Sequence, residues 1–450
     1  MTERILPEGY TYLEHDGARL AFPVEWERAD APAGSLAVVH PEAEGLAFRP
    51  NVVVRVSDYA GSLPALAAFS LATTRAQING CHFVAHDELD LDGGEGRRQR
   101  FAYAAGGFDL VVDRYLAVRG GRALEITVTA TVALAYEMLP VGAVVAGSLD
   151  WDAAAVPASS GTRDAEVSSG TKEPRHDRWL SELAGHPIED LSKLPAVQGY
   201  RSDGPTLSAA AVNLLKEHAK RSRFGRFDVA AHQAEMGELR AAGLIDAAGK
   251  FSPDLEFILG ALREPEFRIE IGARHQGLDT TLDIHVGAGR ALVLAGPSAP
   301  ELIHGVAPRS DGLGGTPRGT FLLDLATTEG VPALIAAWAG LGPAWSVTGN
   351  VRTLEPGELE RGCDAPLAVP TDADAASRRL LAQPWFGWSM TIPDLGFERT
   401  WLNAGAAGHY AVGALDDGGS ELVPVASAQV WDVLLQEIGA ATIARPAAWE

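Results

Sequence analysis

A stretch with almost no apolar side chains divides the sequence in two. The range Val156–Arg178 has one large apolar residue in its interior, Val167, among Ser, Gly, Pro and charged residues. Such a composition buries too little apolar surface to offset the entropy of ordering the chain. We therefore predict a flexible linker over residues 156–178, between an N-terminal domain of residues 1–155 and a C-terminal domain of residues 179–450. A chain of 450 residues is long enough for two domains with separate cores.

Alternating apolar residues predict strands in the N-terminal domain. In one segment Val52, Val54 and Val56 share a face, as the two-residue period of a strand requires. The helix we predict over residues 63–78 begins with Pro64 in its first turn, a favoured position for proline. The pattern indicates an antiparallel sheet with helices on one side, an α+β domain. The predicted strands cover residues 51–58, 96–104, 108–118 and 122–132, and the helices residues 63–78 and 133–147.

The C-terminal domain reads as helices followed by two antiparallel meanders. Helical spacing of apolar residues predicts helices over residues 208–221, 228–242 and 253–262. Strands are predicted over residues 268–273, 281–286 and 290–294, with a helix over residues 328–340 after them. A second set of strands covers residues 387–392, 397–402, 408–414 and 420–424, and a helix over residues 427–439 closes it. This is again an α+β pattern, and the two similar blocks indicate an internal pseudo-duplication.

Charge and apolar run length argue against several classes of partner. The chain carries 37 Lys and Arg against 59 Asp and Glu, a net charge of −22 at pH 7, which repels nucleic acid and anionic membrane surfaces. The longest apolar run is interrupted by Glu137 and Pro140 and is too short to span a bilayer. The N-terminus lacks the pattern of a signal peptide. We therefore expect a cytoplasmic protein without stable membrane insertion, and with Cys81 and Cys363 in different halves we expect no disulfide.

Motifs for catalysis or for metal and cofactor binding are absent from the sequence. It contains no G-x-S-x-G elbow, P-loop, HExxH or CxxC. His82 and His86 are four residues apart, but their segment reads as loop or strand, and a metal site needs three or four converging ligands. His304 and His409 have no triad partners that the sequence identifies. We therefore predict no catalytic residue, metal ligand or cofactor. A catalytic triad assembled from residues distant in the sequence is the alternative.

Two further segments have a structural interpretation. The Gly-rich segment His285–Arg290 lies between two predicted strands, so it indicates a hairpin turn rather than a phosphate-binding loop, which would precede a helix. His285 itself is expected to be a solvated or cross-strand residue. Acidic residues alternate with leucines over Glu88–Asp92, which predicts an edge strand with a solvated face.

Aromatic residues are dense near the second meander. The run Gln383–Trp388 contains two Trp and one Phe. A buried strand that begins there is one interpretation, and an exposed recognition patch is the other. On the second interpretation the partner-binding positions are Trp385, Phe386, Trp388 and Trp401.

The first 150 residues resemble the DcrB/PsbP-like fold, to which the Eag chaperones of type VI secretion belong. The likeness is carried by RLAFPVEW, PNVVVRV, a helix, FDLVVDRYLAV and ALEITVTAT, in that order. The resemblance implies a sheet whose face and edges hold apolar segments of a secreted effector. It implies no catalytic residue.

Residues 207–438 resemble the EspG-type chaperones of ESX, or type VII, secretion. The likeness is carried by LRAAGLIDAAGKFSPDLEFILGALREPEFRIEI, GRALVLAG, VPALIAAWAGLGP and a terminal block from WFGWSMTI to VWDVLLQEI. Together the two resemblances imply a cytoplasmic, non-enzymatic secretion chaperone or adaptor. Its partner would be a secreted effector or a small helical secreted protein. A hydrolase with a triad from distant residues, or a self-associating regulatory module, are the alternatives.

Overall fold

The chain forms two compact units. The computed structural model describes residues 6–42, 47–152, 191, 194–219, 224–305, 316, 319–344 and 350–444. The units are Met1–Ser192 and Lys193–Glu450, here the N-terminal and the C-terminal unit. The linker predicted over residues 156–178 lies outside the described residues. Both units combine antiparallel sheets with helices, so the protein is α+β, as the sequence predicts.

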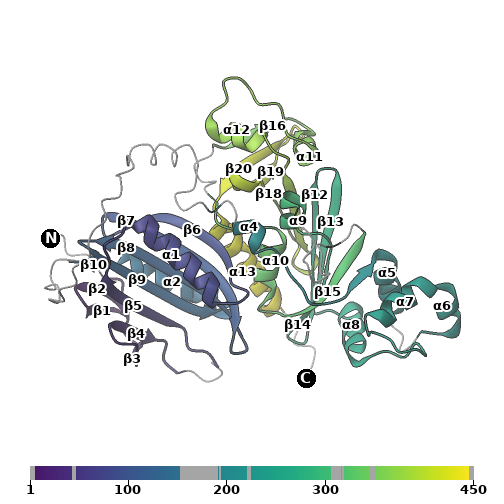
Figure 1. Ribbon diagram of the computed structural model, residues 1–450, viewed down its shortest axis with the longest axis horizontal. Coiled ribbons are helices and arrows are strands. Elements are labelled where there is room, and N and C mark those ends of the chain that lie inside the picture. Colours follow the sequence, from purple (N-terminus) through teal and green to yellow (C-terminus); the bar gives the residue numbers. More distant parts are fainter. Residues whose placement is uncertain are drawn as a thin grey trace, which may run out of the picture. The chain divides into compact units, whose positions relative to one another are not determined.

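Seven antiparallel strands form the main sheet of the N-terminal unit (Figure 1). Their order is β3-β4-β5-β9-β8-β7-β6. Strand β6, in which the acidic residues from Glu88 onward alternate with leucines, is therefore at an edge, as predicted. Gly120 and Gly121 make the hairpin turn between β8 and β9 with φ of 54° and 79°, values that glycine adopts at little cost. The strands are β3 (Glu27–Ala29), β4 (Ser35–Val39), β5 (Asn51–Asp58), β6 (His82–Leu91), β7 (Gly94–Ala105), β8 (Phe108–Arg119) and β9 (Arg122–Thr131).

The two helices that the structure describes in this unit lie on opposite faces of the sheet. Helix α1 (Leu63–Gln77) packs against Leu116 of β8, whereas α2 (Val132–Gly147) shares a core with the neighbouring Tyr115. A Cβ on Gly142 of α2 would lie 2.7 Å from a methyl group of Val128, so this glycine lets α2 approach β9 closely. The prediction of helices on one side is therefore wrong, because successive residues of β8 point to opposite faces and both faces are apolar there.

A small second sheet covers the α2 side of this core. Its strands are β1 (Tyr10–His15), β2 (Ala18–Pro23) and β10 (Asp150–Trp151), in the order β1-β2-β10. Leu20 and Phe22 of β2 are fully buried and belong to the same core as α2. This strand brings the start of the unit beside the residues that follow α2.

One antiparallel sheet of ten strands runs through the C-terminal unit. The order is β11-β15-β14-β13-β12-β17-β18-β19-β20-β16. The two predicted meanders are thus joined edge to edge, with Ile271 of β12 opposite Met390 of β17. The strands are β11 (Thr206–Ser208), β12 (Phe267–His275), β13 (Leu278–Gly287), β14 (Arg290–Ala295), β15 (Thr320–Thr327), β16 (Arg352–Leu354), β17 (Phe386–Ile392), β18 (Phe397–Asn403), β19 (His409–Ala414) and β20 (Ser420–Val425).

The two halves of this sheet repeat one order of elements. In each half a three-residue edge strand and helices precede four meandering strands, and a helix follows them. This symmetry supports the predicted pseudo-duplication at the level of topology. The helices are α4 (Leu194–Val197), α5 (Ala209–His218), α6 (Arg226–Ala231), α7 (Gln233–Ala241), α8 (Pro253–Arg263), α9 (Ala299–His304), α10 (Val331–Trp338), α11 (Glu358–Asp364), α12 (Ala375–Leu381) and α13 (Ser427–Ile443).

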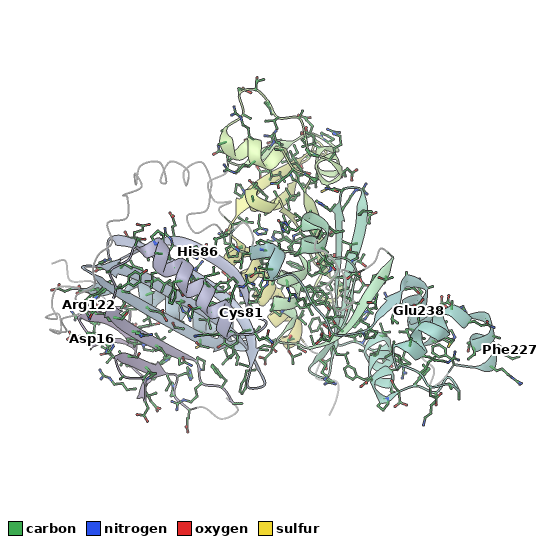
Figure 2. All side chains as sticks on the ribbon, in the orientation of Figure 1. Asp16, Cys81, His86, Arg122, Phe227 and Glu238 are labelled. Carbon is green, nitrogen blue, oxygen red and sulfur yellow. The ribbon has the colours of Figure 1, made fainter. Side chains whose placement is uncertain are left out.

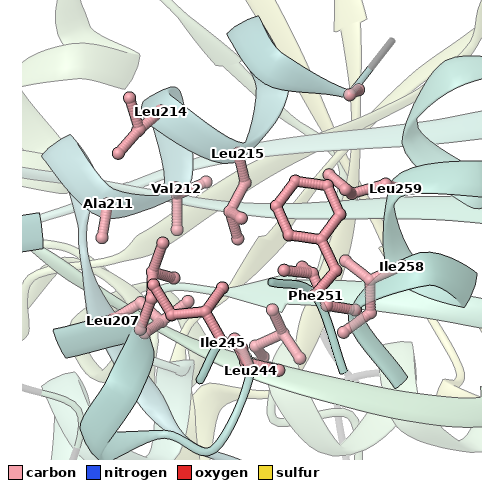
Figure 3. Packing of buried hydrophobic residues seen from close by; sticks show 14 of the residues in the cluster. Leu207, Ala211, Val212, Leu214, Leu215, Leu244, Ile245, Phe251, Ile258 and Leu259 are labelled. Carbon is pink, nitrogen blue, oxygen red and sulfur yellow. The ribbon is translucent and has the colours of Figure 1, made fainter. Parts of the chain in front are cut away.

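Helices cover one face of the ten-stranded sheet at its two ends. Helices α5 to α8, here the helical lobe, bury Leu215, Phe251 and Leu259 against Leu292 of β14 (Figure 3). At the other end α11 and α12 pack on β18, β19 and β20. Between the two groups of helices lies the exposed strip of β12, which is formed by the alternate residues Arg268, Glu270 and Gly272. Helices α10 and α13 contact each other.

Candidate functional site

The four aromatic residues expected to contact a partner are buried. The exposed fractions are 0% for Trp385 and Phe386, 3% for Trp388 and 2% for Trp401. The expectation of an exposed recognition patch is therefore wrong, and the alternative of a buried strand is confirmed.

Strand alternation and close packing explain this burial. Trp388 and Trp401 are opposite each other on β17 and β18, with ring centroids 4.5 Å apart and planes at 25°. Phe386 meets Trp338 of α10 edge to face at 5.7 Å. Trp385 donates its indole N–H to the Leu380 carbonyl at 2.7 Å. Each ring is thus held by neighbours within the unit.

The histidines singled out from the sequence do not form a metal site. His82 and His86 lie on strand β6 and are buried (His86 is labelled in Figure 2). Among the described residues no three His, Cys, Asp or Glu side chains lie close enough to hold a metal ion. His409 is buried with its Nε2 3.2 Å from the Gly342 carbonyl, and burial lowers its pKa to about 4. The turn after His285 is the predicted hairpin, with Gly287 paired to Arg290.

A cleft of about 390 Å³ lies beside α1 in the N-terminal unit. Helix α1 covers β7 and β8 and leaves the same face of β5 and β9 beside it uncovered. One wall is therefore the flank of the helix, and the other is the uncovered half of the sheet. The cleft is lined by Arg55, Ser57, Tyr59, Leu66, Phe69, Ser70, Thr73, Thr74, Gln77, Arg114, Ala123 and Glu125.

The wall formed by α1 carries an exposed aromatic ring. The buried stripe of the helix includes Leu63, Ala67 and Thr74, which lie at helical spacing. Phe69 lies off this stripe, and 68% of its surface is exposed. A large apolar side chain at the mouth of a cleft gains free energy when another apolar group covers it.

Arg114 of β8 lies in the inner part of the cleft and is held by hydroxyl groups of α1. Its Nη1 donates to Ser70 Oγ at 2.9 Å and to Thr74 Oγ1 at 2.7 Å. Ser70 in turn donates to the buried Gln99. Arg114 Nε makes no hydrogen bond within the described part of the chain, and the nearest acidic oxygen is Glu125 Oε1 at 3.6 Å. The guanidinium is thus fixed in place, with its buried Nε in ion-pair range of Glu125.

Arg55 of β5 provides a second cation at the rim. It lies opposite Glu125 in the register of β5 and β9, yet it makes no ion pair with any described residue and is exposed. Two arginines and one glutamate make the cleft net positive on a chain of net charge −22. This arrangement favours an anionic group beside an apolar one.

Sequence reasoning missed this cleft, although one signal for it was present. The helix over residues 63–78 was predicted with its proline, but Phe69 falls outside the stripe that such a helix buries. A large apolar residue off the buried stripe is a sign of a contact surface. Arg55 and Arg114 come from strands β5 and β8, which are not neighbours in the sheet, so their proximity depends on the fold.

Comparisons with known proteins establish no family. No protein-family model and no curated protein matches the sequence. LpqN, described as involved in cell envelope biogenesis of Mycobacterium tuberculosis, is 14% identical over 31% of this chain and 88% of its own, with a TM-score of 0.26. The cyanobacterial PsbP of Synechocystis is 12% identical over 33% of this chain and 95% of its own, also with a TM-score of 0.26.

A third similar structure covers more of the chain. A protein from Bacteroides thetaiotaomicron is 11% identical over 63% of this chain and 89% of its own, with a TM-score of 0.25. At these scores the likenesses support no conclusion about the fold or the function of this chain. The EspG-type resemblance of the C-terminal residues stays a prediction. None of the described helices is long and apolar enough to cross a membrane.

Proposed function

We propose that the protein is a non-enzymatic binding protein that holds a segment of a partner protein in the cleft beside α1. The occupant is an extended stretch with a large apolar side chain next to a carboxylate. The observation that carries the proposal is the pairing of exposed Phe69 with Arg55, a cation without an ion pair among the described residues.

The dimensions of the cleft support a short segment rather than a folded domain. Its volume of about 390 Å³ falls in the range of ligand pockets, roughly 300–1,000 Å³, and suits one or two large side chains. Apolar contact with Phe69 would supply affinity. The exposed Arg55 at the rim would orient a carboxylate.

The proposal also names the class of partner protein and the cellular compartment in which it is bound. From the segments that resemble Eag-type and EspG-type chaperones, we infer that the partner is a secreted effector or a small helical secreted protein, bound in the cytoplasm before export. Shielding an apolar segment of such a partner is a task for a shallow cleft with an exposed aromatic rim. Copurification with the products of neighbouring genes tests this part, and a stable stoichiometric complex is the expected result.

The binding test uses full-length protein and a panel of fluorescent peptides. Each peptide has a central Leu-Phe pair flanked by Glu, by Lys or by Ser, and binding is followed by fluorescence anisotropy. We expect the Glu-flanked peptide to bind most tightly. Phe69→Ser should weaken it by at least about tenfold, because the loss of an apolar contact of 1.5–3 kcal/mol is about one to two factors of ten. Arg55→Glu should reverse the preference in favour of the Lys-flanked peptide.

Tyr136→Ser is the matched control. Tyr136 lies on α2 in the same unit and is 62% exposed. Its substitution therefore removes an aromatic ring of similar exposure that lies away from the cleft. Equal weakening by Tyr136→Ser and Phe69→Ser would contradict the proposal, as would an unchanged peptide preference in Arg55→Glu. A concentration-dependent dimer that Phe69→Ser abolishes would assign the cleft to a second copy of the chain instead.

A further inference from the structure

A second cleft, in the C-terminal unit, contains a buried histidine with an unsatisfied ring nitrogen. The cleft has a volume of about 220 Å³ and lies where the helical lobe meets the exposed strip of β12. Lys216 of α5 and Leu262 of α8 form one wall, and Arg268 and Glu270 of β12 form the other. His285 of β13 lies between the two walls.

The position of His285 in the sheet explains its burial. It is opposite Leu292 of β14, which belongs to the core of the helical lobe, and opposite Arg268 of β12 on the other side. The lobe therefore covers one side of the ring, and 9% of the residue is exposed. The prediction of a solvated histidine is wrong, whereas its cross-strand position is confirmed. Its Nδ1 is buried and makes no hydrogen bond with any described atom.

Charged groups from three elements surround the ring. Lys216 Nζ lies 3.0 Å from Asp283 Oδ2, and Arg268 Nη1 lies 3.4 Å from Glu270 Oε1. The two acids thus balance the two cations, and both cations keep N–H groups toward solvent, with side chains 40% and 45% exposed. Burial lowers the pKa of His285 to about 4, with Lys216 and Arg268 acting in the same direction and Asp283 against them.

We propose that this cleft binds a small oxyanion, a carboxylate or a tetrahedral anion, between Lys216, Arg268 and His285. The guanidinium and ammonium groups are the donors that proteins use for such anions, and the orphan nitrogen of His285 supplies a further polar group. With its two ion pairs the cleft has no net charge while His285 is neutral. A bound anion adds negative charge beside the ring and favours its protonated form.

Anion binding and protonation of His285 are therefore linked. By reciprocity, an anion that raises the pKa of His285 by one unit binds tenfold more tightly to the protonated protein than to the neutral one. The site takes up anion as the pH falls and releases it as the pH rises through the pKa of the bound form. This activity is independent of the cleft beside α1 and goes beyond the proposed function.

The test uses sulfate and, as the carboxylate probe, trifluoroacetate, because the charge of both anions stays constant over the pH range in which His285 titrates. The titration of His285 in the full-length protein is followed by NMR of the ring protons, assigned by comparison with His285→Gln. With NaCl at equal ionic strength as the reference, saturating sulfate or trifluoroacetate should raise the pKa of His285 by one unit or more. The probe with the larger shift identifies the class of anion.

Matched variants separate a specific site from general charge. Lys216→Gln and Arg268→Gln should each weaken binding about tenfold, and Lys250→Gln, at an exposed lysine of the same unit, should leave it unchanged. His285→Gln should bind without dependence on pH. Arg268 is exposed, so its variant reports on the site even if His285→Gln does not fold. Equal weakening by Lys250→Gln, or a pKa of His285 that neither anion moves, would overturn the proposal.

Discussion

Loss of the indole ring of Trp401 should destabilise the C-terminal unit strongly. The residue is 2% exposed and stacks on Trp388, so Trp401→Ala removes a complete core side chain and leaves a cavity. Such substitutions cost about 3–5 kcal/mol, a large share of the ~5–15 kcal/mol that stabilises a typical protein. The stacked pair adds ~0.5–1.5 kcal/mol beyond the burial of area.

Urea unfolding of the full-length protein, followed by tryptophan fluorescence and circular dichroism, measures this change. Because the chain forms two compact units, we expect two transitions, and Trp26→Ala, in the N-terminal unit, identifies the one that Trp401→Ala should not move. A double-mutant cycle of Trp388→Phe, Trp401→Phe and the double variant should give a coupling free energy of about 1 kcal/mol, since the two rings are in contact.

Two results would refute this reasoning. One is a decrease in the free energy of unfolding of less than about 1 kcal/mol for Trp401→Ala, which would mean that the ring is not packed in a core. The other is a folded variant of unchanged stability that fails to bind the Glu-flanked peptide, which would restore Trp401 to a binding surface.

Three further predictions concern buried groups. Arg100 and Asp113 form an ion pair with contacts of 2.7 and 2.8 Å, and their side chains are at most 4% exposed. Arg100→Met should lower the free energy of unfolding in urea by about 3–5 kcal/mol, because it leaves the Asp113 carboxylate buried without its partner. Adding Asp113→Leu should recover most of this loss. Burial raises the pKa of the Cys81 thiol to about 12 and that of Cys363 to about 11, so both should resist iodoacetamide at pH 8 until the protein is denatured, as measured by mass spectrometry. His409 stays neutral in the folded protein down to its pKa of about 4, so below pH 6.5 the unfolded state binds the extra proton. Stability should therefore fall by up to about 3 kcal/mol between pH 6.5 and 4, and His409→Gln should remove this share of the pH dependence in thermal unfolding.

Local patterns predicted most individual elements. The helix that begins after Ser62 extends over Leu63–Gln77, with the Ser62 side chain accepting from the Ala65 N–H as an N-cap does. The strand predicted over residues 122–132 is β9, and the Gly-rich segment His285–Arg290 contains the predicted hairpin turn. These features depend on residues near in sequence, which is why the sequence alone predicts them.

Elements that depend on distant or weak signals were missed. The helix predicted over residues 228–242 is interrupted at His232, whose φ and ψ are −123° and 51°. The polar stretch before Gln383 contains helix α12, which Asp374 caps by accepting from the Ser377 N–H at 2.7 Å. Its few apolar residues give little helical periodicity, so its cap is the main signal.

The candidate sites follow from the way the elements are assembled. Dense aromatic residues at Trp385 indicated an apolar surface, but only the register with β18 and the presence of α10 show that the rings are covered. Phe69 gave the opposite case, a single apolar residue that stays 68% exposed in the described part of the chain. His285 alternates with Asp283 as a solvated residue would, and the helical lobe, which is far away in sequence, buries it.

Photocrosslinking from position 69 tests the central claim most directly. p-Benzoylphenylalanine replaces Phe69 in the full-length protein, or Tyr136 in the control, and the Glu-flanked peptide is added and irradiated. We predict an adduct from position 69 that unlabelled peptide competes away, and none from position 136. An adduct of equal yield from position 136, or no adduct from position 69, would contradict a binding site beside α1.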